Sequence, residues 1–295
     1  MTGAQACLLP DGRLHLHHGP MDLIATADGA GQINAFKAAI ARFSGLLEEL
    51  VAELPELRQP WHDGRAFDGP VARTMEEATR PYLPEFITPM AAVAGAVADD
   101  ILAVMVAAAP LSRAIVNNGG DIAFHLSEGE TATFAIAGLP GSRVTIHHED
   151  PWRGVATSGW RGRSHSLGIA DHVTVLARTA AEADAAATMI ANAVDLPGHP
   201  AVARTPAREL SPDSDLGDRL VTVAVGDLSS AETAKALQWG LQKANATVAR
   251  GLAGAALLGL NGEICMTGVF PAIAPGAPIT LKDTHQSTRR EVLHA

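Results

Sequence analysis

The chain has 295 residues, of which 47% are hydrophobic and 18% charged. This is enough for one large domain, or two closely packed halves, with a buried core. A formal charge of −10 without a dense run of Lys or Arg argues against a nucleic-acid partner. Aromatic residues make up only 4%, whereas there are 28 glycines, so we expect a core built by close approach of backbones. We predict a single domain over residues 1–295 and leave open a duplication into halves at about 1–195 and 196–295.

In chain order, apolar and polar residues first alternate over 12–27, which predicts a strand or hairpin arm. Residues 31–59 place apolar side chains at helical spacing and predict one long amphipathic helix. The stretch 60–88 is polar and contains Pro and Gly, which favours an irregular loop.

Residues 89–110 have the length and hydropathy of a membrane span. However, Asp99 and Asp100 lie at the middle, where each acid would cost roughly 2.5–3.5 kcal/mol in a bilayer. Thr88 as N-cap and Pro89 at the first helical position are signals of a soluble helix. We therefore predict a nearly fully buried helix over 89–109 and no membrane partner.

Two apolar runs flank the sequence Asn117-Asn118-Gly119-Gly120 and are expected to be strands, as are 132–140 and 142–150. A loop is expected over 151–165, then a strand over 171–177. An alanine-rich helix follows, and its predicted capping box consists of Thr179 and Glu182.

In the last third, the Pro and Asp content of 196–218 predicts a surface linker. A strand over 219–226 and a helix with a Ser229/Glu232 capping box follow. The final hairpin is expected to turn on Asn261-Gly262. Helices mixed with several hairpins indicate an α+β protein, which we expect to consist of two packed βαβ-type halves around an antiparallel sheet.

Two polar residues stand out in the alanine-rich helix. Asp184 and Thr188 are four residues apart and share one helix face. Oxygen ligands of this kind suit a hard cation such as Mg²⁺, which completes its shell with water and substrate phosphates. The structural alternative is that Asp184 caps or pairs with a nearby group while Thr188 bonds back to a backbone carbonyl.

The context of this pair resembles a known family. ATSG (156–159), SH (164–165), VTVLA (173–177) and EADAAAT (182–188) occur in this order, with NNGGDI (117–122) upstream. This succession resembles the ApbE family, flavin transferases that move FMN from FAD onto a protein threonine. The resemblance implies an ApbE-like fold of tandem ferredoxin-like or T-fold-like halves.

The resemblance also implies roles for individual residues. Asp184 and Thr188 would hold Mg²⁺ on the FAD pyrophosphate, and His165 would act as base towards the accepting threonine. The residues expected to bind the cofactor are Asn118, Gly119, Gly120, Asp121, Thr157, Ser158 and Gly159. We expect them to converge on one cleft. Local alternatives remain: a tight hairpin turn at NNGG, an ordinary polar loop at ATSG, and a surface position for His165.

The function that these features favour is a Mg²⁺-dependent enzyme acting on FAD or a related pyrophosphate or nucleotide. The alternative is a non-transferase protein of the same fold that binds a flavin, a pterin-like compound or another small ring. Arg161 and Arg163 could bind a phosphate or be solvated. Cys7 and Cys265 form no CxxC pair, and the first twenty residues lack a secretory signal, so we expect a cytoplasmic protein. A protein acceptor and a homo-oligomer are left open.

Overall fold

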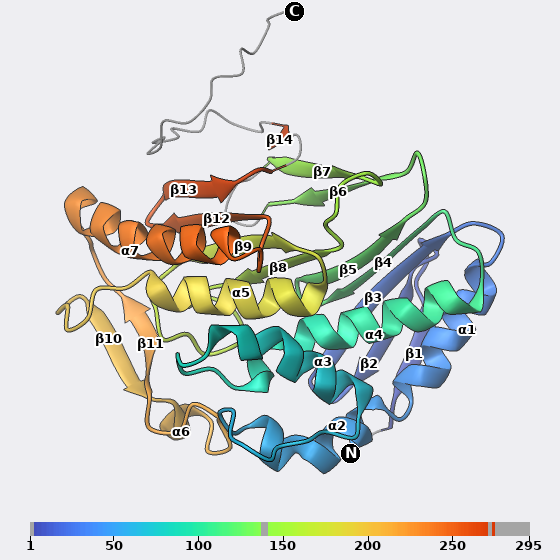
Figure 1. Ribbon diagram of the computed structural model, residues 1–295, viewed down its shortest axis with the longest axis horizontal. Helices are drawn as coiled ribbons and strands as arrows, with labels where there is room; N and C mark the ends of the chain where they lie inside the picture. The colour runs from blue at the N-terminus through green and yellow to red at the C-terminus, as the bar shows by residue number, and fades with distance from the viewer. Residues whose placement is uncertain (1–2, 137–140, 271–272, 275–295) are drawn as a thin grey trace, which may run out of the picture.

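The centre of the molecule is a large antiparallel sheet. The computed structural model describes residues 3–136, 141–270 and 273–274. The strands of the large sheet are β1 (Gln5–Leu8), β2 (Leu14–His18), β3 (Met21–Asp28), β4 (Arg113–Asn118), β5 (Asp121–Leu126), β8 (Gly154–Ser158), β9 (His172–Ala177), β12 (Ala255–Leu260) and β13 (Glu263–Gly268). They lie in the order β1-β2-β3-β4-β5-β8-β9-β12-β13 (Figure 1), and every neighbouring pair is antiparallel. The expected α+β class is confirmed.

Helices cover one face of this sheet. They are α1 (Gln32–Phe43), α2 (Leu46–Leu57), α3 (Pro70–Thr79), α4 (Val93–Ala108), α5 (Ala180–Ala193), α6 (Ala207–Leu210) and α7 (Ser230–Ala249), with 3-10 turns η1 (Arg80–Tyr82) and η2 (Pro89–Ala92). Figure 1 shows α4, α5 and α7 across the sheet, with α5 in the middle. The main apolar core lies between these helices and the sheet.

A smaller sheet of β6 (Thr131–Ala135), β7 (Arg143–His147) and β14 (Ile273–Ala274) covers part of the opposite face. Because side chains alternate along a strand, Ala123 of β5 faces the helices whereas Phe124 packs against Phe134 of the small sheet. The central strands are therefore buried on both faces. Of the strand expected over 132–140, residues 137–140 lie outside the described residues.

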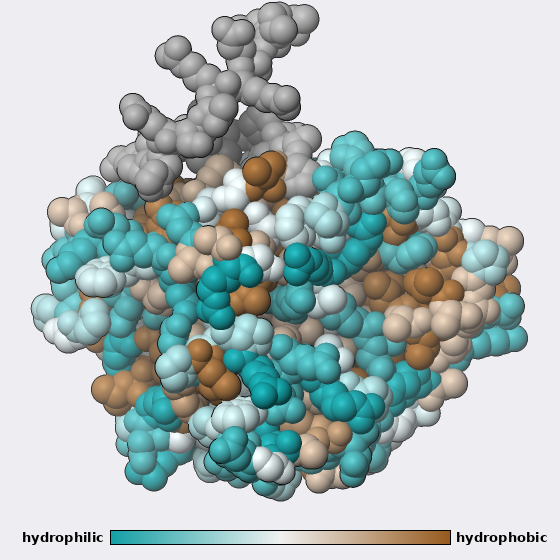
Figure 2. All heavy atoms as spheres, viewed as in Figure 1, coloured by the Kyte–Doolittle hydropathy of each residue, from teal (hydrophilic) through white to brown (hydrophobic). Residues whose placement is uncertain are grey.

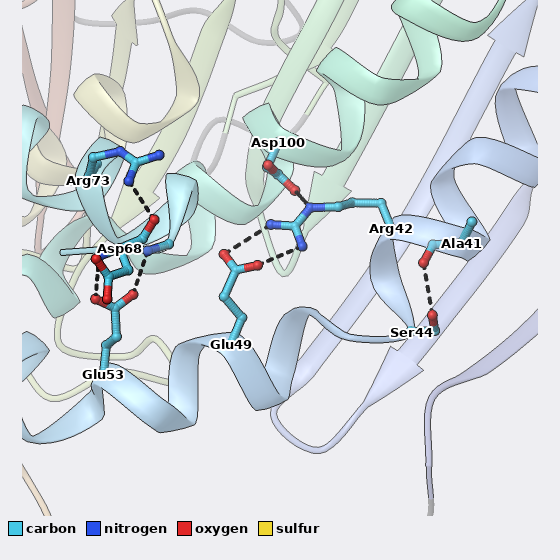
Figure 3. A network of polar contacts seen from close by, with 9 residues as sticks. Ala41, Arg42, Ser44, Glu49, Glu53, Asp68, Arg73 and Asp100 are labelled. Carbon is cyan, nitrogen blue, oxygen red and sulfur yellow. Dashed lines mark hydrogen bonds and ion pairs between the residues drawn. The ribbon is translucent and has the colours of Figure 1, made fainter.

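The long helix expected over 31–59 is wrong, because the chain breaks between α1 and α2 at Ser44 and Gly45. Both residues have low helix propensity. Arg42 then spans the break, donating to Glu49 of α2 at 2.8 Å and to Asp100 of α4 at 2.6 Å (Figure 3). This half-buried ion-pair network fixes the bent helix pair against α4.

Three loop expectations were wrong in part. Within 60–88 the chain forms α3, with Pro70 at a first-turn position where proline is favourable. Glu53 accepts hydrogen bonds from the N–H groups of Asp68 and Gly69 just before it (Figure 3). Within 151–165 residues 154–158 form β8, and within 196–218 the chain forms α6 and β10 (Val202–Pro206).

The helix expected over 89–109 begins as the turn η2 and continues as α4. Its near-complete burial was wrong. Residues Pro89–Ala108 have a mean hydropathy of 1.9, long and apolar enough for a membrane span by composition, but only 39% of that window is buried. Figure 2 shows apolar residues gathered over α4. The helix nevertheless packs against neighbouring helices through both of its acids, Asp99 and Asp100, as a helix of a globular fold does.

The capping box and the hairpin turn predicted in the last third of the chain are confirmed, and the N-cap predicted for α5 is present as well. Ser229 and Glu232 form a reciprocal capping box at the start of α7. The β12–β13 hairpin turns on Asn261 and Gly262, whose φ angles are 50° and 77°, as a type I′ turn requires. Thr179 caps α5 by accepting from the Glu182 N–H at 3.1 Å, although the Glu182 side chain does not return the bond.

The duplicated halves stay a prediction. Each expected half contains one strand followed by a helix, β9–α5 in the first and β11–α7 in the second, with β11 spanning Leu220–Val225. Whereas β9 lies inside the large sheet, β11 pairs with β10 in a separate two-stranded sheet.

Candidate functional site

Helix α5 is the element that carries the predicted metal ligands, and it is packed unusually closely. Its alanines are almost all buried. Glycines of neighbouring segments contact its backbone directly: a Cβ on Gly95 would lie 2.2 Å from the Ala180 oxygen, and one on Gly154 would lie 2.0 Å from the Thr179 oxygen. No other residue fits at such positions. The small residues of both partners therefore bring α4 and β8 against the N-terminus of α5.

Where α4 and α5 cross, an aspartate of each helix accepts hydrogen bonds from N–H groups near the start of the other helix. Asp99 of α4 accepts hydrogen bonds from the N–H groups of Ala180 and Ala181, at 3.0 and 2.9 Å. In return, Asp184 Oδ2 of α5 accepts from the Gly95 N–H near the start of α4, at 3.1 Å. Free N–H groups at a helix start favour a carboxylate. The structural alternative for Asp184 thus holds: it caps another helix.

Asp184 does more than cap, because a second acid lies beside it. Asp121 begins β5, and its Oδ1 is buried without a hydrogen-bond partner among the described residues. Burial raises the pKa of Asp121 to about 7, against the opposing effects of the Thr157 N–H and the Arg163 charge. Burial, and next the negative charge of Asp121, raise the pKa of Asp184 well above its usual range. The two carboxylates therefore form one interacting acidic pair.

The NNGG turn holds Asp121 in this place. Gly119 and Gly120 have φ angles of 67° and 118°, which favour glycine, and the Gly120 N–H donates to Asn117 Oδ1 at 2.8 Å. The buried Asn118 side chain donates from Nδ2 to the Ala94 oxygen at 3.1 Å. The expected hairpin turn is therefore present, and it is tied to the beginning of α4.

A free cation lies over this turn. A Cβ on Gly119 would lie 2.5 Å from Arg163 Nη2. Arg163 is exposed, and it has no ion pair with any residue of the described ranges. Arg161, by contrast, pairs with Asp171 at 2.7 Å and lies over the Trp160 ring. Of the two arginines, Arg163 is the one without an ion pair among the described residues, and its charge acts on Asp121.

The ATSG residues lie at the end of β8, next to Asp121. The Thr157 hydroxyl is 2.9 Å from the Thr174 hydroxyl of β9, so it serves the sheet, and Ser158 is half-buried. Gly159 is buried, and a Cβ there would lie 2.4 Å from the Asp171 oxygen. The ATSG residues, for which a polar loop was one expectation, therefore form the end of strand β8 and pack against β9 and Asp171.

His165 and Thr188 complete the predicted set. His165 Nε2 lies 3.0 Å from Ser211 Oγ. Four residues after Ser211, Asp215 accepts a hydrogen bond from the Thr88 hydroxyl at 2.5 Å. Within the described ranges, no hydrogen bond joins His165 to either acid. Thr188 is half-buried, one turn after Asp184, and its hydroxyl has no hydrogen-bond partner in the part of the chain that the structure describes.

A family model described as AbpE bacteria matches residues 6–266. The chain belongs to this family. A UPF0280 protein of Methanopyrus kandleri is 32% identical over 176 residues, which cover 58% of this chain and 69% of that protein. UPF0280 proteins of Methanothrix thermoacetophila and Methanococcoides burtonii are 38% and 41% identical, over 42% and 39% of this chain. Those two matches span 52% and 49% of the relatives, about half of their length.

Among solved structures, the crystal structure of Pseudomonas stutzeri flavinyl transferase ApbE in its apo form aligns with a TM-score of 0.37 and 12% identity. The alignment covers 67% of this chain and 87% of that one. A likeness this distant carries no information on the site of this chain.

The donor atoms fit a hard cation. Asp121 offers an unpaired buried oxygen, Asp184 offers the carboxylate that also accepts from the Gly95 N–H, and Thr188 adds a hydroxyl without a hydrogen-bond partner among the described residues. Magnesium prefers such oxygen ligands and keeps several waters, so a small protein set is sufficient. The described residues contain no group of three or more His, Cys, Asp or Glu arranged for a metal, so a dedicated all-protein cage is not present in them.

A groove of about 610 Å³ lies elsewhere, between α7 and the segment 193–200. Trp239 and Lys235 line it together with Pro197, and none of the predicted site residues does. We assign the candidate site of this chain to the acidic pair instead, because Asp121 has an unpaired buried oxygen there and the charge of Arg163 acts on the same carboxylate. The cleft expected to contain all predicted residues stays a prediction.

Sequence reasoning missed Gly95 and Asp99. Gly95 lies inside a helical pattern, where glycine is unfavourable by about 1 kcal/mol relative to alanine. Its presence was a signal of close packing. Asp99 was interpreted only as an argument against a membrane span.

Proposed function

We propose that this chain is a Mg²⁺-dependent enzyme that acts on FAD or a related nucleotide pyrophosphate, with transfer of the FMN portion to an acceptor as its reaction. The observation that carries the proposal is the interacting pair of Asp121 and Asp184, two half-buried acids of which Asp121 keeps a buried oxygen without a partner among the described residues. Two carboxylates that share a low-dielectric site need a proton or a cation between them. Family membership and the order of the ATSG, SH and EADAAAT motifs support flavin transfer.

In this proposal, Asp121, Asp184 and Thr188 hold the cation. When bound, Mg²⁺ neutralises charge on the pyrophosphate oxygens and assists departure of the AMP portion. Arg163, whose guanidinium lies against Gly119, contributes a second positive charge, and a phosphate could approach the backbone at Gly120, where a Cβ would have nothing within 4 Å. The N–H groups of Ser158 and Gly159 complete the anion-binding surface in this proposal.

His165 takes the proton of the accepting hydroxyl. An imidazole is suited to this role because its ordinary pKa lies near neutral pH. Its Nε2 contacts Ser211 Oγ, which orients the ring and leaves Nδ1 for the acceptor. The acceptor we propose is a protein threonine, which must enter beside the 211–215 segment.

Cation binding should displace a proton. Because Asp121 and Asp184 have raised pKa values, part of the pair is protonated near neutral pH, and a divalent ion must compete with that proton. We therefore expect Mg²⁺ affinity to increase as the pH rises from 6 to 8, with release of protons on binding.

One observation favours the alternative, a flavin or pterin-like ring bound without transfer. Asp184 already serves as a cap for α4, which gives its carboxylate a structural purpose without a metal. Such a protein would bind riboflavin and FAD equally well, and neither would need Mg²⁺.

The deciding experiment is a titration of FAD by calorimetry, with and without Mg²⁺, on wild type and on Asp121→Asn and Asp184→Asn. Loss of at least tenfold in the Mg²⁺-dependent affinity in both variants supports the proposal. Asp195→Asn is the matched control, because Asp195 lies beyond the far end of α5 in an ion pair with Arg204. Equal affinity in wild type and both site variants overturns it.

Transfer itself is tested by AMP release from FAD. We expect AMP only with Mg²⁺ and a threonine-containing acceptor protein, and its loss in His165→Gln. Binding of FAD that is independent of Mg²⁺, without AMP release, selects the alternative.

The compartment we propose is the cytoplasm. Cys7 and Cys265 are both free thiols, as a reducing environment favours.

A further inference from the structure

A second chemical site lies at the opposite edge of the large sheet from β13, on the exposed surface of β1, β2 and β3. Cys7 of β1 lies directly across from His15 of β2, and Cys7 Sγ is 3.8 Å from His15 Nδ1. The other nitrogen of the same ring, Nε2, is 2.5 Å from Asp22 Oδ1 of β3. The imidazole therefore lies between a thiol and a carboxylate.

This arrangement determines which nitrogen of His15 can take a proton. An ionised carboxylate only accepts hydrogen bonds, so Nε2 of His15 must carry the N–H that Asp22 accepts. Nδ1 is then the unprotonated nitrogen, and its lone pair faces the Cys7 thiol. In triads of this kind the carboxylate orients the imidazole and stabilises its protonated form.

We propose that Cys7 is a nucleophilic thiol, with His15 as its base and Asp22 as a positioning residue, and that it reacts with disulfides of low molecular mass. In the exchange, the Cys7 proton moves to His15 Nδ1. The Cys7 sulfur attacks one sulfur of the disulfide, a new S–S bond forms, and the old S–S bond breaks. The leaving thiolate carries away the electron pair and takes the proton from His15, so no external oxidant is needed.

The location permits this reaction. Every residue of β1 is exposed, and β1 is an edge strand of its sheet. The side chains of His15 and Asp22 are 32% and 50% exposed, so a small disulfide can reach all three groups. The other titratable group on this surface that contacts the triad is His17, whose Nδ1 is 4.0 Å from Asp22 Oδ1.

The second thiol of the chain provides an internal contrast. Cys265 is half-buried in β13, and burial raises its pKa to about 11. Because the thiolate is the attacking species, Cys265 should react slowly, and the two thiols should be separable by rate.

The test uses the full chain with Cys265→Ser, so that Cys7 is the single thiol. We would measure the second-order rate constant with an aromatic disulfide whose released thiolate absorbs light, from pH 5 to 9. A free cysteine is only a few per cent thiolate at pH 7, so pairing with His15 should raise the rate there about tenfold. His15→Gln should remove this gain and shift the pH profile to that of a free thiol.

Asp22→Asn should lower the rate constant of Cys7 at pH 7 about threefold and shift its pH profile. The reason is that position 22 then no longer fixes which nitrogen of His15 carries the proton. His147→Gln is the matched control, since it makes the same substitution at an exposed position of β7, in the other sheet, and it should react like the parent. The substitutions at positions 15, 22 and 265 are at half-buried or exposed positions, and circular dichroism checks the folding of every variant. Identical pH profiles in the parent, His15→Gln and Asp22→Asn would overturn the proposal.

Discussion

Asp99 and Asp184 each complete the N-terminus of the helix that carries the other. Asp99 binds the first two N–H groups of α5, and Asp184 binds the Gly95 N–H of α4. The residue before α4 is Ala92, which has no capping group of its own. At α4 a contact between helices therefore takes the place of a local cap, whereas at α5 it adds to the local cap Thr179.

Removing the Asp99 cap should destabilise the fold. A lost N-cap typically lowers the free energy of unfolding by about 0.5–2 kcal/mol, and we expect Asp99→Ala near the upper end because two N–H groups lose their acceptor. Urea denaturation at pH 7.5 measures this. Asp63→Ala, at an exposed loop position, serves as control and should match wild type. An Asp99→Ala midpoint equal to that of the control would refute the capping role.

The stability of the metal-free protein should increase as the pH falls. Asp121 has a pKa of about 7 in the folded state against the ordinary value of 3.8. Between these values the folded state binds more protons than the unfolded state, so stability decreases as the pH rises from about 4 to 7. The slope can reach about 1.4 kcal/mol per pH unit for each proton, and Asp184 acts in the same direction.

Thermal unfolding between pH 5 and 8 measures this dependence. In Asp121→Asn the slope should become smaller, because one of the two acids no longer titrates. Saturating Mg²⁺ should raise the melting temperature more at pH 8 than at pH 5. A wild-type slope that Asp121→Asn leaves unchanged would exclude Asp121 as the group responsible.

Gly95→Ala should disrupt the crossing of α4 and α5. The added Cβ would lie 2.2 Å from the Ala180 oxygen, which is backbone and has no side-chain freedom to move aside. We expect a loss of stability of about 3 kcal/mol, at the upper end for overpacking. Gly45→Ala adds the same methyl group where nothing lies within 4 Å and should not destabilise. Equal denaturation midpoints for the two variants would contradict this packing.

Arg163→Gln should weaken nucleotide binding while the protein stays folded. Arg163 is exposed and has no ion pair among the described residues, but its charge lowers the pKa of Asp121, so the pH dependence of stability should change as well. We expect FAD affinity to fall about tenfold, the loss of one charge-assisted contact, with riboflavin affinity unchanged. Arg161→Gln is the matched control, because Arg161 is already paired with Asp171. A similar effect of both substitutions would assign no particular role to Arg163.

Elements with local signals could be predicted from the sequence. The Ser229/Glu232 box, the Asn261-Gly262 turn and the NNGG hairpin each depend on residues within a few positions of one another. The α1–α2 break was missed because helical periodicity continues through Ser44 and Gly45. Strand β8 was missed because the Gly, Pro and Arg residues around it are typical of loops.

The site was predictable only in part, for a related reason. The sequence indicated that Asp184 needs a partner but could not choose between a metal and a cap. Its partners Gly95 and Asp121 lie 89 and 63 positions earlier in the chain, and no periodic pattern connects them. Only the fold brings the two acids together, and with them the raised pKa values that make a cation site reasonable.

The exchanged caps have a consequence for how the molecule opens. Neither α4 nor α5 can satisfy its first N–H groups alone, so separating the two helices exposes both ends in one event. The backbone amides of Gly95, Ala180 and Ala181 belong to different helices, yet they should exchange with deuterium at a common rate. The two helices would then behave as one cooperative unit, and a ligand held by Asp184 would slow exchange on both sides of the crossing at once.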